Sequence, residues 1–227
     1  MYNPAVMNKS PFDLVIFDCD GVLVESEPLA CQIYVQLWAE FGVRLDYAET
    51  LREFHGETLA RRVETTALKH GWIPPESFIP VFNERLSALT ERELQAVPHV
   101  QELIESLSVP KCVASNGSRD EITLRLEVAN LTHYFGNSIF SGVEVPHPKP
   151  APDLFLVAAA AFQVKPARCV VIEDSELGVT AAIAAGMTVY GHATFNSAES
   201  LRAAGAIPFS SMLALKEILA RETSPLP

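Results

Sequence analysis

Five short apolar runs without polar alternation constrain the fold of this chain more than any other feature. They lie at Leu14–Phe17, Cys112–Ala114, Ile139–Phe140, Val170–Ile172 and Thr188–Tyr190. Runs of this kind are typical of strands that are buried on both faces, as in a parallel sheet covered by helices. Helical patterns separate the later runs. The alternation of strand and helix therefore predicts an α/β fold with a doubly wound, Rossmann-like parallel sheet and right-handed crossovers.

Three amphipathic patterns supply the predicted helices of this core. The first has apolar residues at positions i, i+3, i+4 and i+7 counted from Val100. The second follows Pro152, a residue suited to a first helical turn. The third covers residues 176–185 and ends before Gly186, which suits a left-handed helix cap.

The stretch from Glu25 to Ala96 contains helical patterns but no convincing strand. We expect one helix ahead of Gly42, and further helices over Tyr47–Phe54, Leu59–His70 and Pro75–Glu93. A helical insert of this size after the first strand predicts a small cap domain. The predicted units are a tail at 1–11, a catalytic core at 12–24 and 97–227, and the cap at 25–96.

Residues 22–26 and 94–98 would connect the predicted cap to the core and act as its hinges. Within the cap, Trp38 and Trp72 are expected to pack in the interior.

Composition excludes several classes of function. Lys and Arg total 17 against 28 Asp and Glu, a formal net charge of −11, which argues against a nucleic-acid or anionic-membrane surface. No apolar run approaches the roughly 18 residues of a membrane span. The first eleven residues lack the features of a signal peptide, and the four cysteines form no CxxC pair. We expect a cytoplasmic protein with reduced, buried thiols.

Polar side chains follow four of the predicted strands. They are Asp18 and Asp20, Ser115 and Asn116, Lys149, and Glu173 and Asp174. In an open α/β sheet, ligands bind beyond the carboxyl ends of the strands, so these groups should share one rim.

The residue types at this rim indicate phosphoryl chemistry. Asp18 and Asp20 stand at i and i+2 and point to the same side of an extended segment, so one can attack while the other serves as acid and base. The crowded carboxylates call for a hard divalent cation, and Mg²⁺ is the usual choice beside phosphate. Ser115 and Lys149 offer donors to phosphate oxygens. Each feature alone is common in turns and helix caps, so the prediction depends on their conjunction.

The same conjunction resembles the haloacid dehalogenase-like phosphatases. Four motifs carry the resemblance: FDCDGVLVES at 17–26, VASNGS at 113–118, KPAPDLF at 149–155 and VIEDSELG at 171–178. The insert after the first motif is similar to the small cap of the β-phosphoglucomutase-like subgroup.

The resemblance implies a role for each core residue. Asp18 would attack phosphorus, and Asp20 would protonate the leaving alcohol and then activate water. Asp18, Asp174 and the backbone carbonyl of Asp20 would hold Mg²⁺, with Glu173 supporting the ion directly or through water. Ser115 and Lys149 would bind the transferring phosphoryl group, helped by the backbone at Asn116.

Two residues bear on the type of reaction within this family. Asp20 is acidic, whereas dehalogenases have a non-acidic residue there. In β-phosphoglucomutases a histidine stands twelve residues after the nucleophile, but this chain has Ala30. The motifs look most like the bacterial 6-phosphogluconate phosphatase branch. A sugar phosphomutase and a non-catalytic phosphate-binding module remain as alternatives.

Substrate selectivity in this family comes from the cap. The candidates here are Glu25, Glu27, Arg52, His55, Arg61 and Arg62. Arg52 or Arg61 could bind the carboxylate of a sugar-acid phosphate, and His55 lies where a cap loop could reach the site. We therefore expect a monomer that acts on a small phosphorylated metabolite, with no nucleic-acid or membrane partner.

Overall fold

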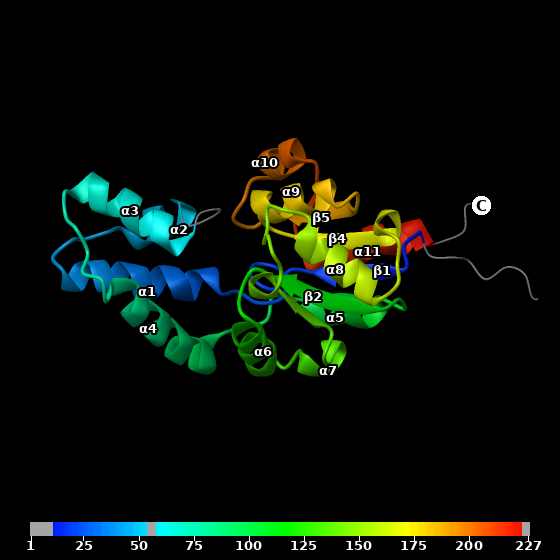
Figure 1. Ribbon diagram of the computed structural model, residues 1–227, viewed down its shortest axis with the longest axis horizontal. Coiled ribbons are helices and arrows are strands. Elements are labelled where there is room, and N and C mark those ends of the chain that lie inside the picture. The colour runs from blue at the N-terminus through cyan, green and yellow to red at the C-terminus, as the bar shows by residue number, and fades with distance from the viewer. Residues whose placement is uncertain (1–10, 54–57, 224–227) are drawn as a thin grey trace, which may run out of the picture.

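The structure is a computed structural model that describes residues 11–53 and 58–223. Its six-stranded sheet has the order β3-β2-β1-β4-β5-β6, and every neighbouring pair is parallel. The strands are β1 (Leu14–Phe17), β2 (Lys111–Ser115), β3 (Ile139–Ser141), β4 (Cys169–Glu173), β5 (Thr188–His192) and β6 (Ile207–Phe209). The predicted doubly wound α/β fold is confirmed, with β1 at the centre (Figure 1).

The central strand explains why its sequence shows no polar alternation. Val15 and Phe17 belong to one hydrophobic cluster, whereas Leu14 and Ile16 belong to a second, and all four side chains are fully buried. Successive side chains of a strand point to opposite faces, so the sheet separates two cores and both faces need apolar residues.

Helices cover both faces of the sheet (Figure 1). The first cluster is closed by α5 (Val100–Ser106), α6 (Arg119–Val128), α7 (Thr132–Phe135) and α11 (Met212–Thr223). The second is closed by α8 (Asp153–Ala161), α9 (Glu176–Ala184) and α10 (Ala198–Ala204). Two short 3-10 helices, η1 (Gly142–Glu144) and η2 (Pro166–Arg168), lie in the connections.

No strand is expected from the sequence after Tyr190, but the sheet continues to β6. This strand has only three residues, Ile-Pro-Phe, and its proline lacks a backbone donor. Proline is tolerated in an edge strand because one side of that strand has no neighbour, and β6 is at the edge of the sheet. A run so short carries no recognisable strand pattern.

The insert after β1 is helical, as predicted. It consists of α1 (Glu27–Glu40), α2 (Tyr47–Glu53), α3 (Leu59–His70) and α4 (Phe78–Glu93), which form a cap beside the core (Figure 1). A third hydrophobic cluster belongs to this insert alone. At its centre Trp38 is fully buried, with its ring centroid 5.2 Å from those of both Trp72 and Phe78.

The two chain segments that join the cap to the core lie side by side. Glu25 donates its backbone N–H to the Gln95 carbonyl at 3.0 Å, and Val97 donates to the Leu23 carbonyl at 2.9 Å. Helix α4 also packs against α6 of the core. The segments predicted as hinges, 22–26 and 94–98, are therefore adjacent, and their movement stays a prediction.

The remaining expectations concern surface and redox chemistry. All four cysteines are free and buried, as predicted. Among the described residues, no helix has the length and apolar character needed to cross a membrane. The predicted tail falls almost wholly on residues 1–10, which lie outside the described residues.

Candidate active site

The loop after β1 brings the first carboxylates to the rim of the sheet. Asp18 donates its backbone N–H to the Ile172 carbonyl at 2.9 Å, and Leu23 closes the following turn by donating to the Cys19 carbonyl at 2.8 Å. Gly21 adopts φ +70, and a Cβ there would lie 1.9 Å from Oδ2 of Asp174. Only glycine therefore permits this turn so close to a second carboxylate.

Lys149 joins two of the predicted carboxylates. Its ammonium lies 2.6 Å from Oδ1 of Asp18 and 2.7 Å from Oε1 of Glu173, and the lysine side chain is only 4% exposed. Burial alone would lower the pKa of Lys149, but the charges of Asp18 and Glu173 raise it above its ordinary value. The ammonium therefore stays charged throughout the physiological range.

Three buried carboxylates crowd this end of the sheet. Asp18, Glu173 and Asp174 each place an oxygen within 4.8 Å of the others. Burial raises the pKa of Asp18 to about 7, an effect that Lys149 opposes and Glu173 reinforces. Burial, followed by the charges of Glu173 and Asp18, also raises the pKa of Asp174. One lysine thus leaves the cluster short of positive charge, which is the environment a bound cation would complete.

Glu173 is held more tightly by the protein than its neighbours. Its Oε2 accepts three hydrogen bonds at 2.9 Å, from the backbone N–H groups of Asp174 and Ser175 and from the Ser175 hydroxyl. A Cβ at Gly178 would lie 1.7 Å from Oε1. The first turn of α9 thus packs directly on this carboxylate and fixes its orientation.

The phosphate-binding candidates come from β2 and the loop before α8. Ser115 is buried at the end of β2. The Asn116 amide donates to the Lys149 carbonyl at 3.1 Å, and the Lys149 N–H donates to Oδ1 of Asn116 at 3.0 Å. This reciprocal pair ties the two loops together. Because the Asn116 side chain is used in this way, its backbone is the part of the residue that remains for phosphate.

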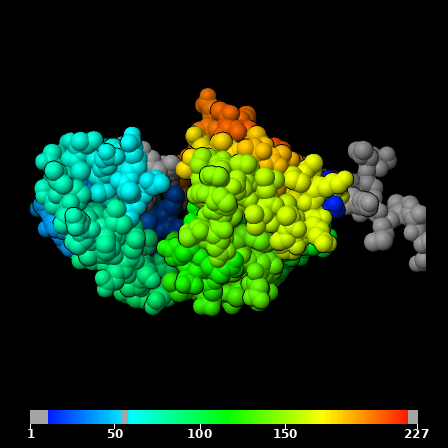
Figure 2. Space-filling view, viewed as in Figure 1, coloured from blue at the N-terminus to red at the C-terminus, as the bar shows by residue number. Residues whose placement is uncertain are grey.

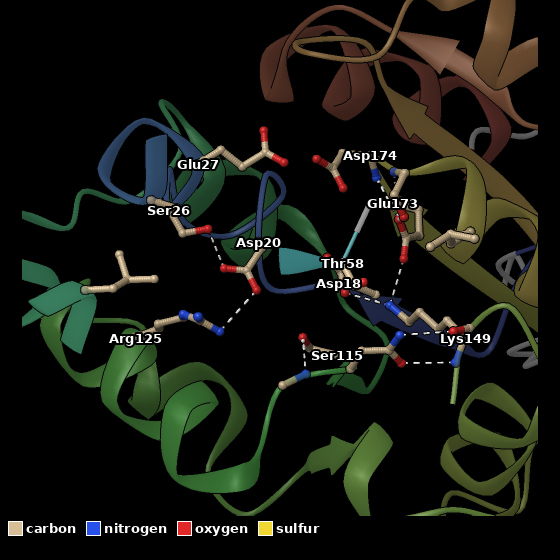
Figure 3. Close-up of a pocket in the computed structure, with 16 residues that line it drawn as sticks. Asp18, Asp20, Ser26, Glu27, Thr58, Ser115, Arg125, Lys149, Glu173 and Asp174 are labelled. Atoms are coloured by element: carbon tan, nitrogen blue, oxygen red, sulfur yellow. Dashed lines mark hydrogen bonds and ion pairs between the residues drawn. The ribbon is translucent and has the colours of Figure 1, made fainter. Parts of the chain in front are cut away.

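Asp20 lies apart from the acidic cluster and faces different partners (Figure 3). The Ser26 hydroxyl donates to its Oδ1, and Arg125 of α6 donates Nη1 to its Oδ2 at 3.1 Å. The Asp20 side chain is 33% exposed, compared with 11% for Asp18. The two aspartates of the first motif thus occupy different environments, as a nucleophile and an acid–base group require.

All of these groups line one cavity of about 340 Å³ between the core and the cap. The cap contributes Ser26, Glu27, Ala30, Thr58 and Leu86 to the lining. Figure 2 shows the hollow between the cap helices and the core.

Comparison with known proteins agrees with this site. The family model described as haloacid dehalogenase-like hydrolase matches residues 15–192, which span all four motifs. The chain belongs to the haloacid dehalogenase-like hydrolases.

Two relatives of the chain are phosphatases by name. The chain is 34% identical to 6-phosphogluconate phosphatase of Escherichia coli, over 80% of this chain and 82% of that protein. It is 32% identical to the phosphorylated carbohydrates phosphatase of Thermotoga maritima, over 91% of this chain and 100% of that protein. The protein is accordingly a phosphatase, as expected, and the alternative of a non-catalytic binding module is not retained.

Solved structures give the same family. A conserved haloacid dehalogenase-like protein from Agrobacterium tumefaciens superposes with a TM-score of 0.86 at 33% identity, covering 94% of this chain and 100% of that one. A family hydrolase from Deinococcus radiodurans, solved with bound phosphate and sodium, gives a TM-score of 0.83 at 36% identity, covering 94% and 97%.

The predicted core residues line the cavity in this hydrolase, whereas most of the predicted cap residues within the described ranges do not. Asp18, Asp20, Ser115, Lys149, Glu173 and Asp174 all line the same cavity. Of the substrate-binding candidates, Asn116 and Glu27 also line it, whereas Glu25 is exposed outside it. Their roles in catalysis and substrate binding stay predictions.

The cap arginines lie away from this cavity in the structure. Arg52 donates Nε to the Ala48 carbonyl of its own helix, and Arg61 is exposed beside Glu64. Arg62 is buried and donates to the Glu53 carbonyl within the cap. His55 lies outside the described residues.

Arg125 also lines the cavity, although no sequence pattern marks it as a site residue. In the sequence it stands four residues after Glu121, a spacing typical of a solvent-exposed ion pair on a helix. The structure instead directs it to Asp20, with its side chain only 15% exposed. No local pattern distinguishes these two arrangements.

Proposed function

We propose that the protein is a Mg²⁺-dependent phosphomonoesterase that hydrolyses a sugar or sugar-acid phosphate through an aspartyl-phosphate on Asp18. The observation that carries this proposal is the placement of Asp18 beside Lys149, Glu173 and Asp174 in a cavity lined by both core and cap. Phosphoryl transfer needs positioning and charge neutralisation above all, and this arrangement can supply both.

Asp18 is the group best placed to attack. Lys149 holds its Oδ1. Among the described residues, the structure gives no hydrogen bond to Oδ2, so that oxygen is available as the nucleophile. Oδ2 would form a bond to phosphorus as the bond from phosphorus to the ester oxygen breaks. Lys149 and Ser115 would hold the transferring phosphoryl oxygens.

Asp20 would act as the general acid in the first step and as the general base in the second. In its protonated form it gives a proton to the leaving ester oxygen, which departs as the alcohol. As a carboxylate it then takes a proton from the water that attacks phosphorus, releasing inorganic phosphate and free Asp18. Its separation from the acidic cluster supports a role different from that of Asp18, because Asp20 is more exposed and hydrogen-bonds Ser26 and Arg125 in place of Lys149.

The donor set fits a magnesium ion. Carboxylate oxygens are the ligands that Mg²⁺ prefers, and the cluster of Asp18, Glu173 and Asp174 is short of positive charge. Asp18, Asp174 and the Asp20 carbonyl would hold the ion, with Glu173 supporting it. When bound, it supplies the charge that neutralises the carboxylates and the phosphoryl oxygens.

The proposed substrate class rests on the relatives and on the absence of a mutase feature. Two curated relatives act on phosphorylated sugars or sugar acids by name. Ala30 lines the cavity at the position where β-phosphoglucomutases have a histidine, and its methyl group cannot move a proton. Transfer of the phosphoryl group to water is therefore favoured over transfer to a second sugar hydroxyl.

The test is hydrolysis of an aryl phosphate and of 6-phosphogluconate, with Mg²⁺ and with excess chelator. Asp18→Asn should abolish turnover of both while leaving the fold intact, since asparagine is nearly isosteric but cannot attack. Asp120→Asn is the matched control, because Asp120 is exposed on α6 outside the cavity. Normal turnover by Asp18→Asn, or by wild-type protein in excess chelator, would contradict the mechanism.

A further inference from the structure

Arg125 enters the cavity from the core and not from the cap. It stands on α6, the helix that begins directly after the Ser115–Gly117 loop. Its guanidinium reaches Asp20 on the side away from Lys149 (Figure 3). It also lines a small crevice of about 50 Å³ with Leu86 and Thr90 of α4, so it lies where cap and core meet.

The charges lining the cavity give this arginine a particular importance. Five carboxylates line it, from Asp18, Asp20, Glu27, Glu173 and Asp174. Among the described residues, its basic lining side chains are Lys149 and Arg125. Lys149 is committed to two carboxylates. Any anionic group on a substrate, other than the phosphate, would face net repulsion unless Arg125 received it.

Arg125 has donors to spare for such a group. A guanidinium carries five N–H donors in a fixed planar fork. The structure gives Arg125 one hydrogen bond to a described residue, from Nη1 to Asp20. The contact with Asp20 therefore orients the planar guanidinium and leaves further N–H donors available. A planar fork of this kind matches a carboxylate in two-point geometry.

We propose that Arg125 is the specificity-determining residue that binds the carboxylate of a sugar-acid phosphate in this cavity. The inference rests on the proposed function, in which Asp20 protonates the leaving oxygen. Lys149 and Ser115 then lie on the phosphoryl side of the ester, and Arg125 lies beyond Asp20, on the side of the leaving group. The partly buried position of Arg125 excludes water and strengthens its attraction for an anion.

The experiment measures binding without turnover. In Mg²⁺ buffer, calorimetry compares 6-phosphogluconate with glucitol 6-phosphate on Asp18→Asn protein. These two open-chain ligands differ only in a carboxylate against a hydroxymethyl group. The same pair is then measured on Asp18→Asn/Arg125→Gln and on Asp18→Asn/Arg119→Gln. Arg119 is the matched control, because it lies on the same helix but is 45% exposed and paired with Glu144.

The Asp18→Asn protein and the Arg119 variant should prefer the sugar acid by about tenfold or more, equivalent to about 1.4 kcal/mol. Arg125→Gln should remove that preference and leave glucitol 6-phosphate binding within about twofold. Arg125→Lys, a second variant that keeps the charge but not the fork, should keep a smaller preference.

Two results would overturn the inference: a preference that survives Arg125→Gln, or no preference in the Asp18→Asn protein. Loss of wild-type turnover on every phosphate ester would instead refute the phosphatase mechanism. Because binding is measured separately, the two failures can be told apart.

Discussion

The buried acidic cluster should make the metal-free protein less stable as the pH rises. Burial raises the pKa of Asp18 from 3.8 to about 7. Between these two values the folded protein binds more protons than the unfolded chain, so the free energy of unfolding falls with increasing pH. Asp18→Asn removes this titration while keeping the shape of the side chain and an oxygen for Lys149.

The expected size follows from the pKa difference. One pKa unit corresponds to about 1.4 kcal/mol, and about two of the units between the two pKa values lie above pH 5. From pH 5 to pH 8 the metal-free wild type should therefore lose about 2.5 kcal/mol relative to Asp18→Asn. For a chain of this length that is a relative shift of about 5–10 °C in the midpoint of thermal unfolding.

The assay is urea or thermal unfolding of both proteins in chelator at pH 5, 6, 7 and 8. Other groups titrate in this range. Burial lowers the pKa of His192, although its hydrogen bond to the Gly21 carbonyl opposes this, and that histidine makes stability rise with pH below about 6.5. Because His192 is present in both proteins, its contribution cancels in the difference.

Magnesium should reverse the trend in the wild type. A cation that binds the ionised carboxylates stabilises the folded state in proportion to its affinity, which grows as those groups lose protons. Added Mg²⁺ should therefore raise the stability of the wild type more at pH 8 than at pH 5. Parallel pH curves for wild type and Asp18→Asn in chelator would refute the reasoning, because the cluster would then hold no uncompensated charge.

Three further predictions concern the reaction. Asp174→Ala should abolish the response of both activity and stability to Mg²⁺, measured by titration of the ion; an unchanged response would remove Asp174 from the metal site. Crystals or scattering of the free and Mg²⁺–BeF₃⁻ forms should differ by a rigid rotation of residues 25–96 and show fluoride at Asp18, whereas an unmoved cap in solution would count against closure. β-Glucose 1-phosphate with catalytic glucose 1,6-bisphosphate should give free phosphate or nothing; isomerisation without phosphate release would show that another residue replaces the histidine missing at Ala30.

The core of the site could be predicted from sequence because parallel strands place their carboxyl ends at one rim. Once β1, β2 and β4 are recognised by their apolar runs, the polar residues that follow them must converge. This is why Asp18, Ser115 and Glu173 were found without any knowledge of packing.

The orientation of the cap side chains and the last strand could not be predicted in the same way. The four cap helices follow from their periodicity, but the direction in which Arg52 or Arg61 points depends on how the helices pack. Likewise, β6 is three residues long and is defined by its pairing with β5. Features that exist only through tertiary contact leave little signal in a local pattern.

The hydrogen-bond partners of Asp20 come from both the hinge segment and the core, which the first motif alone does not reveal. Ser26, whose hydroxyl donates to Asp20, lies within the segment predicted to be a hinge, whereas Arg125 belongs to the core helix against which α4 of the cap packs. The proposed acid therefore has one partner that would move with the cap and one that would stay with the core. A rotation of the cap about 22–26 would change the first contact and leave the second. The position of the cap and the orientation of the acid are thus coupled through the Ser26 hydrogen bond, while Arg125, 105 residues from Asp20 in the chain, ties the same carboxylate to the core.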